Sequence, residues 1–225
     1  MNRQQTSNNS FGNSLNNYNR VVGVDYNLAN ADNSWNGKAY IHKSFTPNIT
    51  GNAISAGLRM QYNSKHWRIS GNSFLVGENF QSDLGFIRRK GVFNAGTQVE
   101  YLHFPNKGFI NRHNFSVAPF FTWTTSDPKQ LADYQIDAQW FAELKNTANI
   151  NAGITTRYTY LFNTFDPSRA GGLALPANSD YRFSQLQIGY RSNAQKTVFF
   201  SVRSVAGQFF NGSLFTQQAD LNVRI

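Results

Sequence analysis

A strict two-residue alternation of apolar and polar side chains is the feature that most constrains how this chain can fold. In residues 54–63 (ISAGLRMQYN), apolar or aromatic side chains alternate with small or polar ones, so that Leu58 and Arg59 point in opposite directions. Successive side chains of a β-strand point to opposite faces of its sheet, and the pattern therefore predicts a strand with one apolar and one polar face. A soluble sheet buries the apolar face against another layer, whereas a membrane barrel turns that face toward lipid.

The same pattern recurs along the whole chain. Strands are predicted at 21–28, 37–45, 54–63, 66–73, 93–101, 115–123, 134–144, 150–160, 181–192, 198–203 and 215–225. No amphipathic helical pattern of ten residues or more interrupts them. We therefore expect an all-β chain of ten to twelve antiparallel strands.

Composition helps to decide which environment the apolar faces meet. Aromatic residues reach 15% and charged residues only 15%, where a soluble domain usually has about 25% charged residues. The mean hydropathy is −0.48 and no run of about 20 apolar residues occurs, which excludes a membrane-spanning helix. A membrane barrel is not excluded, because its strands alternate apolar with polar residues and therefore contain no long apolar run. Aromatic side chains such as Trp67, Tyr101 and Tyr158 lie near the ends of the apolar faces, as in the interfacial girdles of barrels.

An antiparallel transmembrane β-barrel with a polar lumen is therefore the expected fold, with outer-membrane lipid as its surroundings. The alternative is a secreted soluble β-rich carbohydrate-binding protein, in which aromatic side chains on one face would stack against sugars. The two hypotheses differ in whether the apolar face meets lipid or another layer of protein.

Charged side chains in the middle of the polar faces are the candidates for the lumen. They are Arg59, Arg68, Glu100, Asp137, Arg157, Arg191, Arg203, Asp220 and Arg224. The excess of arginine among them, with a net charge of +9 for the chain, suggests a passage whose partners are small polar or anionic solutes. The second expected role is a membrane anchor for a carbohydrate-binding region, with polysaccharide as the partner. Lysine and arginine are spread along the sequence without a concentrated basic patch, so no nucleic-acid partner is expected.

The connections between the predicted strands alternate between tight and long. Residues 63–65, 146–149 and 192–195 form tight connections, whereas 77–91 and 162–180 are long. Bacterial outer-membrane barrels place short turns on the periplasmic side and long loops outside. We therefore expect 77–91 and 162–180 to face the exterior.

The two ends of the sequence suggest that the barrel is incomplete. Residues 1–18 are polar and lack the apolar region of a signal peptide, so they are expected to be a disordered or linker segment before a barrel domain at 19–225. The alternation at 215–225 runs to the last residue without a turn. We expect an export signal upstream, and further strands of the same barrel or a partner subunit to complete the wall.

Patterns that carry catalytic or metal chemistry are weak in this sequence. There are no cysteines, the four histidines are not spaced as metal ligands, and neither an HExxH nor a GxSxG motif occurs. Asp137 and Glu143 share a face but lie roughly 20 Å apart along a strand, too far for paired-carboxylate catalysis. No catalytic residue, cofactor or metal site is therefore predicted, and the chain is not expected to be an enzyme.

The segment 77–91 (GENFQSDLGFIRRKG) breaks the alternation and mixes charged with aromatic side chains. Its motif residues are Gly77, Glu78, Asn79, Phe80, Asp83, Gly85, Phe86, Arg88 and Arg89. Two interpretations are open: an ordered loop with local salt bridges, and a plug or ligand-contacting loop folded over the lumen. The first is favoured, because exposed ion pairs are common and of little energetic value.

With this motif, and with NRVVGVDYNLAN near its start, the chain resembles a family of unknown function from the outer membranes of Bacteroidota. The resemblance covers about Asn19 to Ile225, and its most specific part is the pattern G-[DE]-[ND]-F-x-x-[DE]-x-G-F-x-R-R at Gly77–Arg89. In that family a C-terminal β-barrel domain often follows a carbohydrate-binding module of the family-nine type. The resemblance implies a bacterial outer-membrane location and a barrel fold, and it implies no reaction.

Overall fold

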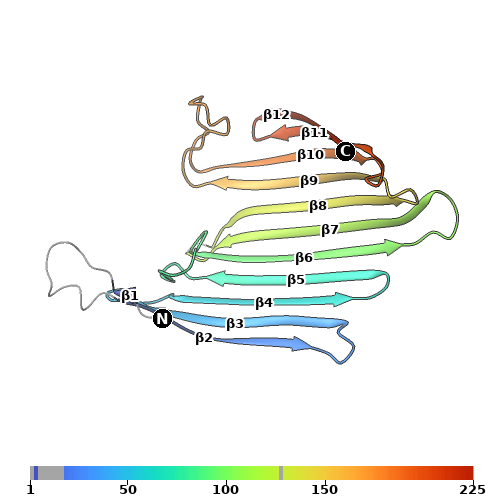
Figure 1. The fold of residues 1–225 in the computed structure, drawn as a ribbon. Helices are drawn as coiled ribbons and strands as arrows, with labels where there is room; N and C mark the ends of the chain where they lie inside the picture. The colour runs from blue at the N-terminus through green and yellow to red at the C-terminus, as the bar shows by residue number, and fades with distance from the viewer. Residues whose placement is uncertain (1–2, 5–17, 127–128, 225) are drawn as a thin grey trace. The chain divides into compact units, whose positions relative to one another are not determined.

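The structure is a computed structural model that describes residues 3–4, 18–126 and 129–224. All the regular structure in these residues is β-strand (Figure 1). No helix in the described ranges is long and apolar enough to cross a membrane. The all-β prediction is therefore confirmed.

Twelve strands occur in the described residues. They are β1 (Arg3–Gln4), β2 (Tyr18–Ala29), β3 (Trp35–Phe45), β4 (Ile54–Asn63), β5 (Trp67–Val76), β6 (Val92–His103), β7 (Ile110–Thr124), β8 (Leu131–Leu144), β9 (Asn149–Leu161), β10 (Ser179–Arg191), β11 (Val198–Phe209) and β12 (Gly212–Val223). The eleven longer strands, β2 to β12, correspond one to one with the eleven predicted segments. Most of the predicted linker 1–18 lies outside the described residues, and the predicted domain boundary stays a prediction.

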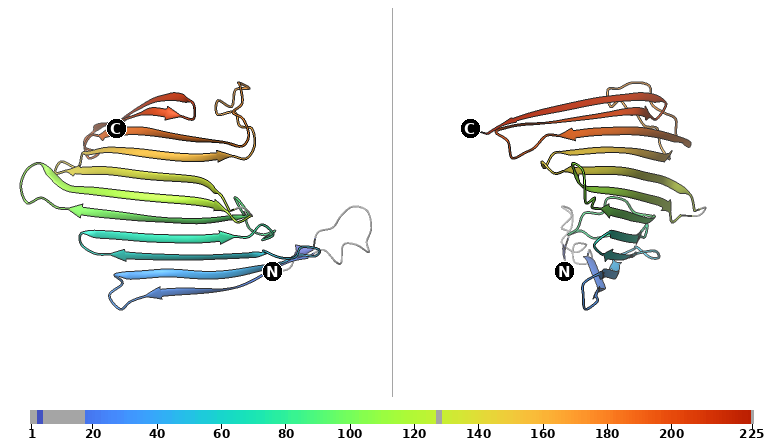
Figure 2. Two further views of the ribbon diagram at one scale, coloured as in Figure 1. Left: turned by 180° about the vertical axis from the view of Figure 1, so that it is seen from behind. Right: turned by 90° about the vertical axis from the view of Figure 1, so that its right-hand side faces the viewer.

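The strands form a single sheet in chain order, each hydrogen-bonded to its sequence neighbours. Two further views show the same succession of strands (Figure 2). Neighbouring strands pair antiparallel, for example β3 with β4 and β9 with β10. The sheet is not closed into a barrel: the ladder ends at β12, and in the part of the chain that is described no strand pairs with its outer edge. The sequence analysis expected an incomplete barrel, and its completion by further strands stays a prediction. Closure would need a hydrogen-bonding partner for that edge, which these strands do not supply.

Two compact units divide the chain. Unit 1 takes in the described residues of Met1–Tyr62, Ser70–Gly96 and Thr122–Leu131, and unit 2 those of Asn63–Ile69, Thr97–Phe121 and Ala132–Ile225. Each unit is described by itself below.

The pairing register sorts the side chains of each unit onto two faces. In unit 1, Ala39 of β3 lies opposite Leu58 of β4, and the next residues, Lys38 and Arg59, oppose each other on the other face. In unit 2, Ile154 of β9 lies between Ala138 and Leu186, while its neighbours on the other face are polar. We call these the apolar face and the polar face of each unit. The predicted alternation is thus kept in register from strand to strand.

Neither face is packed as an ordinary protein core. No large side chain in the described residues is fully buried, and apolar side chains such as Val24 (69% exposed) and Leu186 (61%) lie open on the apolar face. The larger apolar groups that are buried, among them Phe80, Leu175 and Phe183, lie in the long connections or near strand ends. Burial is therefore concentrated where loops fold back onto the strands.

Candidate functional site on the polar face

In unit 1 the polar face carries a charged cluster on β2 and β3 that the sequence analysis did not single out. The Asp25 carboxylate lies 3.0 Å from Lys38 Nζ and 3.2 Å from His42 Nε2. The ring centroids of Tyr40 and His42 are 4.8 Å apart. Every second residue of these strands faces the same way, so the alternation itself could have pointed to this cluster.

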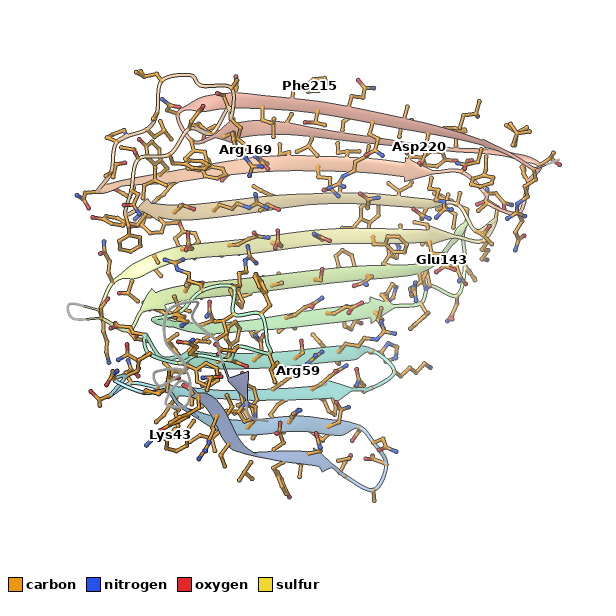
Figure 3. All side chains as sticks on the ribbon, turned by 60° about the vertical axis from the view of Figure 1, so that its left-hand side comes forward. Lys43, Arg59, Glu143, Arg169, Phe215 and Asp220 are labelled. Carbon is orange, nitrogen blue, oxygen red and sulfur yellow. The ribbon has the colours of Figure 1, made fainter. Side chains whose placement is uncertain are left out.

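Arg59 is the one predicted lumen residue in unit 1. It lies on β4 (Figure 3), directly opposite Lys38 on β3, and its side chain is exposed. Lys38 is paired with Asp25, whereas Arg59 makes no hydrogen bond or ion pair with any described residue. Like charges face each other at this position, which is unfavourable unless water or a bound anion separates them.

In unit 2 two arginines are neutralised by carboxylates. Arg68 Nη1 lies 3.5 Å from Glu100 Oε1, and the same oxygen accepts a hydrogen bond from the Asn114 amide. Arg112 Nη2 lies 2.9 Å from Glu143 Oε2. Arg68 and Glu100 are thus brought together as a pair, while Arg112 and Glu143 form a second pair absent from the predicted lumen set.

Asp137 and Arg157 are both hydrogen-bonded to neutral side chains, and one of these, the Gln135 amide, bridges the two. Gln135 donates to Asp137 Oδ2 at 2.7 Å and accepts from Arg157 Nε at 3.0 Å, and Thr155 donates to Asp137 Oδ1 at 2.5 Å. The structure therefore links these predicted residues through one side-chain amide, without an ion pair between them.

Arg203 and Asp220 also have neutral partners. Arg203 Nη2 donates to Gln187 Oε1 at 2.5 Å, and Gln187 in turn donates to Asn151 at 3.3 Å. Asp220, labelled in Figure 3, accepts from the Ser201 hydroxyl at 3.2 Å and from Gln218 at 3.4 Å.

The last two predicted residues share one aromatic ring. The guanidinium carbons of Arg191 and Arg224 each lie 5.7 Å from the centroid of the Phe199 ring. The backbone N–H of Arg224 also donates to Thr197 at 2.8 Å, which fixes the chain just beyond β12.

The motif segment 77–91 folds back onto the polar-face side of β2 and β3 in unit 1. Gln81 N–H donates to the Ser44 hydroxyl at 3.0 Å, and Ser44 belongs to the same face as His42. Asn19, only 6% exposed, donates to the Gln81 carbonyl at 3.1 Å and accepts from Asp83 N–H at 3.1 Å. Partly buried hydrogen bonds to strand residues, which the sequence analysis did not foresee, hold this segment in place.

The start of the segment is tied to the β3–β4 connection. Gly77 N–H donates to Ile54 O at 2.8 Å, and Asn79 donates from its backbone to Asn52 O at 3.2 Å and from its side chain to Thr50 O at 2.9 Å. Phe80 is 7% exposed. The first half of the motif is thus an anchored structure.

The second half of the motif is open to solvent. Gly85 N–H closes a turn onto Ser82 O, and Phe86 is 92% exposed. Arg88 and Arg89 are exposed, and the segment ends at Gly91, whose φ of 65° lies in the left-handed region that favours glycine. The Glu78 side chain packs against Gly91: a Cβ added at Gly91 would lie 2.9 Å from Glu78 Cγ.

In unit 2 the other long connection, 162–178, also folds back. Phe165 and Leu175 pair across it, and the Phe165 ring lies 5.4 Å from that of Phe210. Phe210 in turn contacts Phe183, which shares the polar face of β10 with Gln185. This aromatic cluster lies beside Arg157, because Arg157 and Phe183 oppose each other across β9 and β10.

The comparisons with known proteins identify the family. The model of a family described as "Domain of unknown function (DUF5916)" matches residues 6–225. The chain belongs to the DUF5916 family. No curated protein and no solved structure matches this chain.

This DUF5916 chain offers little for metal or catalytic chemistry in the part that is described. No group of three or more His, Asp or Glu side chains there is placed to hold a metal ion. The absence of enzyme activity stays a prediction. What the polar face does offer is a set of arginines, amides and carboxylates in a hydrogen-bonded arrangement.

Acidification should loosen the 162–178 connection. Asp166 accepts hydrogen bonds from the Ser168 hydroxyl and from the backbone N–H groups of Ser168, Gly171 and Gly172, and these bonds, chiefly that of the hydroxyl, lower the pKa of its carboxyl. A lowered pKa means that the stabilisation is complete above the ordinary value of about 4 and is lost as the pH falls through the folded-state value. Hydrogen exchange, corrected for intrinsic rates, should show lower protection at Gly171 and Gly172 below about pH 4.

Asp166→Asn is the control for this prediction. The amide keeps an acceptor oxygen but does not titrate in this range, so the pH dependence should disappear. Unchanged protection of the natural chain down to about pH 3 would contradict the assignment.

Proposed function

We propose that this chain forms part of the wall of a bacterial outer-membrane β-barrel, with the apolar faces toward lipid and the polar faces lining an aqueous lumen. The exposure of the apolar faces is the observation that carries the proposal. Val22, Val24 and Tyr26 in unit 1 are at least 63% exposed, as are Ile188 and Leu221 in unit 2. A soluble protein rarely leaves apolar area of this extent uncovered, whereas a membrane wall requires it.

The soluble alternative requires a second layer over these faces. A β-sandwich supplies that layer by sending strands back and forth between two packed sheets, usually through Greek-key connections. The strands of this chain instead follow one another in chain order within one sheet, which is the meander of an up-and-down wall. The topology therefore favours the membrane wall over a secreted carbohydrate-binding sandwich.

A wall with an open edge needs a partner inside a membrane. Backbone groups in the hydrocarbon region must be hydrogen-bonded, because no water is there to satisfy them. We therefore propose that further strands of the same barrel, or a partner subunit, pair with β12.

Two roles suit such a wall: a passage for small polar or anionic solutes, and a membrane anchor for an extracellular carbohydrate-binding region. Arginines on the polar faces support the first role, and the family resemblance to Bacteroidota proteins with a family-nine-type module supports the second. In both, the long connections 77–91 and 162–178 face the exterior, because they leave the opposite strand ends from the tight connections β4–β5, β8–β9 and β10–β11.

Conductance in planar bilayers distinguishes the two roles. Reconstituted protein that acts as a passage should give discrete steps, with a reversal potential in a salt gradient that shows preference for anions. Absence of conductance would favour the anchor role, and a clear cation preference would contradict a passage for anions.

A further inference from the structure

We propose that unit 2 binds one anionic glycerophospholipid, with an acyl chain in a groove of the apolar face and the phosphate at lysines of the adjoining short turns. The inference rests on the proposed function, in which the apolar face meets lipid. It deepens that function, because it assigns a lipid of stated charge to one place on the wall.

The groove crosses β6 to β10 on the apolar face of unit 2 and has a volume of about 610 Å³. This volume lies within the range of about 300–1,000 Å³ that is usual for small-molecule pockets. Its floor is made by two small side chains beside larger ones: Ala138 lies opposite Ile154, and Ala152 lies between Trp140 and Ile188. The hollow therefore follows from alanines placed in two neighbouring rows of the apolar face.

The chemistry of the groove fits an acyl chain. Its walls are aliphatic and aromatic side chains such as Val99, Phe115 and Leu186. The indole N–H of Trp140, which also lines the groove, already donates to His113 Nδ1 at 3.1 Å. A sugar or a peptide would have to leave its polar groups without hydrogen bonds here, which is costly, whereas a hydrocarbon chain has none to satisfy.

An aromatic belt lies between the groove and the short turns. The rings of Tyr101 and Trp67 are 4.8 Å apart, and the His113 ring lies 6.0 Å from those of His103 and Trp140. Tryptophan and tyrosine gather where hydrocarbon meets lipid head groups. Trp140 is four residues from the end of β8, about 13 Å of strand, which is within the depth of about 15 Å of one hydrocarbon leaflet.

Lysines occur in all the short turns at this end of unit 2. Every second connection of a sheet in chain order lies at the same end, and in this unit these connections are 64–66, 104–109, 145–148 and 192–197. Each contains one exposed lysine and no carboxylate; the lysines are Lys65, Lys107, Lys145 and Lys196. A row of positive charges without counter-charges in the turns complements anionic head groups at a membrane surface.

Lys107 and Lys145 belong to the two turns that adjoin the groove. These turns touch each other, because the backbone N–H of Lys145 donates to Phe109 O at 2.9 Å. The strands that they connect, β6 with β7 and β8 with β9, all line the groove. The long connection 162–178 at the other end of unit 2 contains Asp166 as well as Arg169, so it lacks the one-signed charge of the turns.

Native mass spectrometry of the full chain in detergent micelles tests the groove. The chain is titrated with phosphatidylglycerol, or with zwitterionic phosphatidylcholine of the same acyl chains, and it should retain one phosphatidylglycerol with about fivefold higher affinity. Ala152→Leu fills the floor and should weaken the binding of both lipids about tenfold, and Ala138→Leu is a second variant with the same expected effect. Ala219→Leu, on the apolar face of β12 outside the groove, is the matched control and should change the affinity less than about twofold.

A pair of double variants tests the head-group contact. Lys107→Gln with Lys145→Gln removes two positive charges beside the groove and should abolish the preference for phosphatidylglycerol. Arg88→Gln with Lys90→Gln removes the same charge from the long connection 77–91 and should leave the preference unchanged.

Three outcomes would overturn the inference: no retained lipid, equal affinity for the two lipids, or equal effects of a variant and its matched control. A fluorophore at position 58, outside the groove, separates this failure from that of the proposed function. If a lipid-phase quencher reaches position 58 but the groove variants behave like Ala219→Leu, the lipid site is wrong and the membrane wall stands. If phosphatidylglycerol is retained while position 58 is shielded from lipid, the membrane wall is wrong and the lipid site stands.

Discussion

In the proposed membrane wall, Leu58→Arg should destabilise the protein by roughly 2–4 kcal/mol, the cost of a basic side chain on a lipid-facing strand at mid-bilayer. Leu58 lies in the middle of β4 on the apolar face and is 50% exposed. Unfolding in urea from lipid vesicles measures the difference in free energy. The effect is large because no water is available at that depth to solvate the guanidinium.

Arg59→Leu is the matched control, one residue away on the opposite face. Arg59 makes no hydrogen bond or ion pair with a described residue and opposes Lys38, so its removal relieves repulsion and should cost less than about 1 kcal/mol. If Arg59→Leu were as costly as Leu58→Arg, the two faces of β4 would not lie in different environments.

Stability alone cannot separate lipid from a packed protein layer, because both penalise a charge at position 58. Chemical accessibility separates them. A lipid-phase quencher should reach a fluorophore at position 58, and a water-soluble reagent should reach a cysteine at position 59. Reversed accessibility, or a position 58 shielded from both reagents, would contradict the membrane wall.

Alternation predicted the strands well where it was strict and less well where polar residues interrupted it. Residues 54–63 form β4 with the predicted bounds. In contrast, β7 begins at Ile110, five residues before the predicted Phe115, because Asn111, Arg112 and Asn114 leave no run of alternation to detect. The sheet continues there because backbone pairing to neighbouring strands does not depend on side-chain polarity.

The candidate site was predictable as a face but not as a set of contacts. The period of two places Arg68 and Arg203 on the polar face equally, and nothing in the sequence says that one meets Glu100 and the other Gln187. These partners come from other strands, so their identity depends on register. The anchoring of 77–91 by Asn19, 64 residues before Asp83, is non-local in the same way.

Gly77→Ala should release the 77–91 segment from the strands. A Cβ at this position would lie 2.0 Å from the backbone oxygen of Asn52, so the chain there must move. That movement breaks the Gly77–Ile54 hydrogen bond and the neighbouring Asn79–Asn52 bond, and it exposes Phe80. Losing these contacts together should cost about 3 kcal/mol, since buried groups left without hydrogen bonds add to the lost burial of the ring.

Trypsin measures the release directly, because Arg88, Arg89 and Lys90 follow one another in this segment. Cleavage at these positions should become much faster in Gly77→Ala, since a protease needs a chain segment that can leave its surroundings. Gly71→Ala is the control: a Cβ on Gly71 of β5 meets no atom within 4 Å, and cleavage should stay at the natural rate. Because the anchored half of the segment lies on the polar face, its release should also change any conductance of a passage. Equal cleavage in the two variants would mean that Gly77 does not hold the segment, and that Asn19 and Ser44 are sufficient to keep it on the strands.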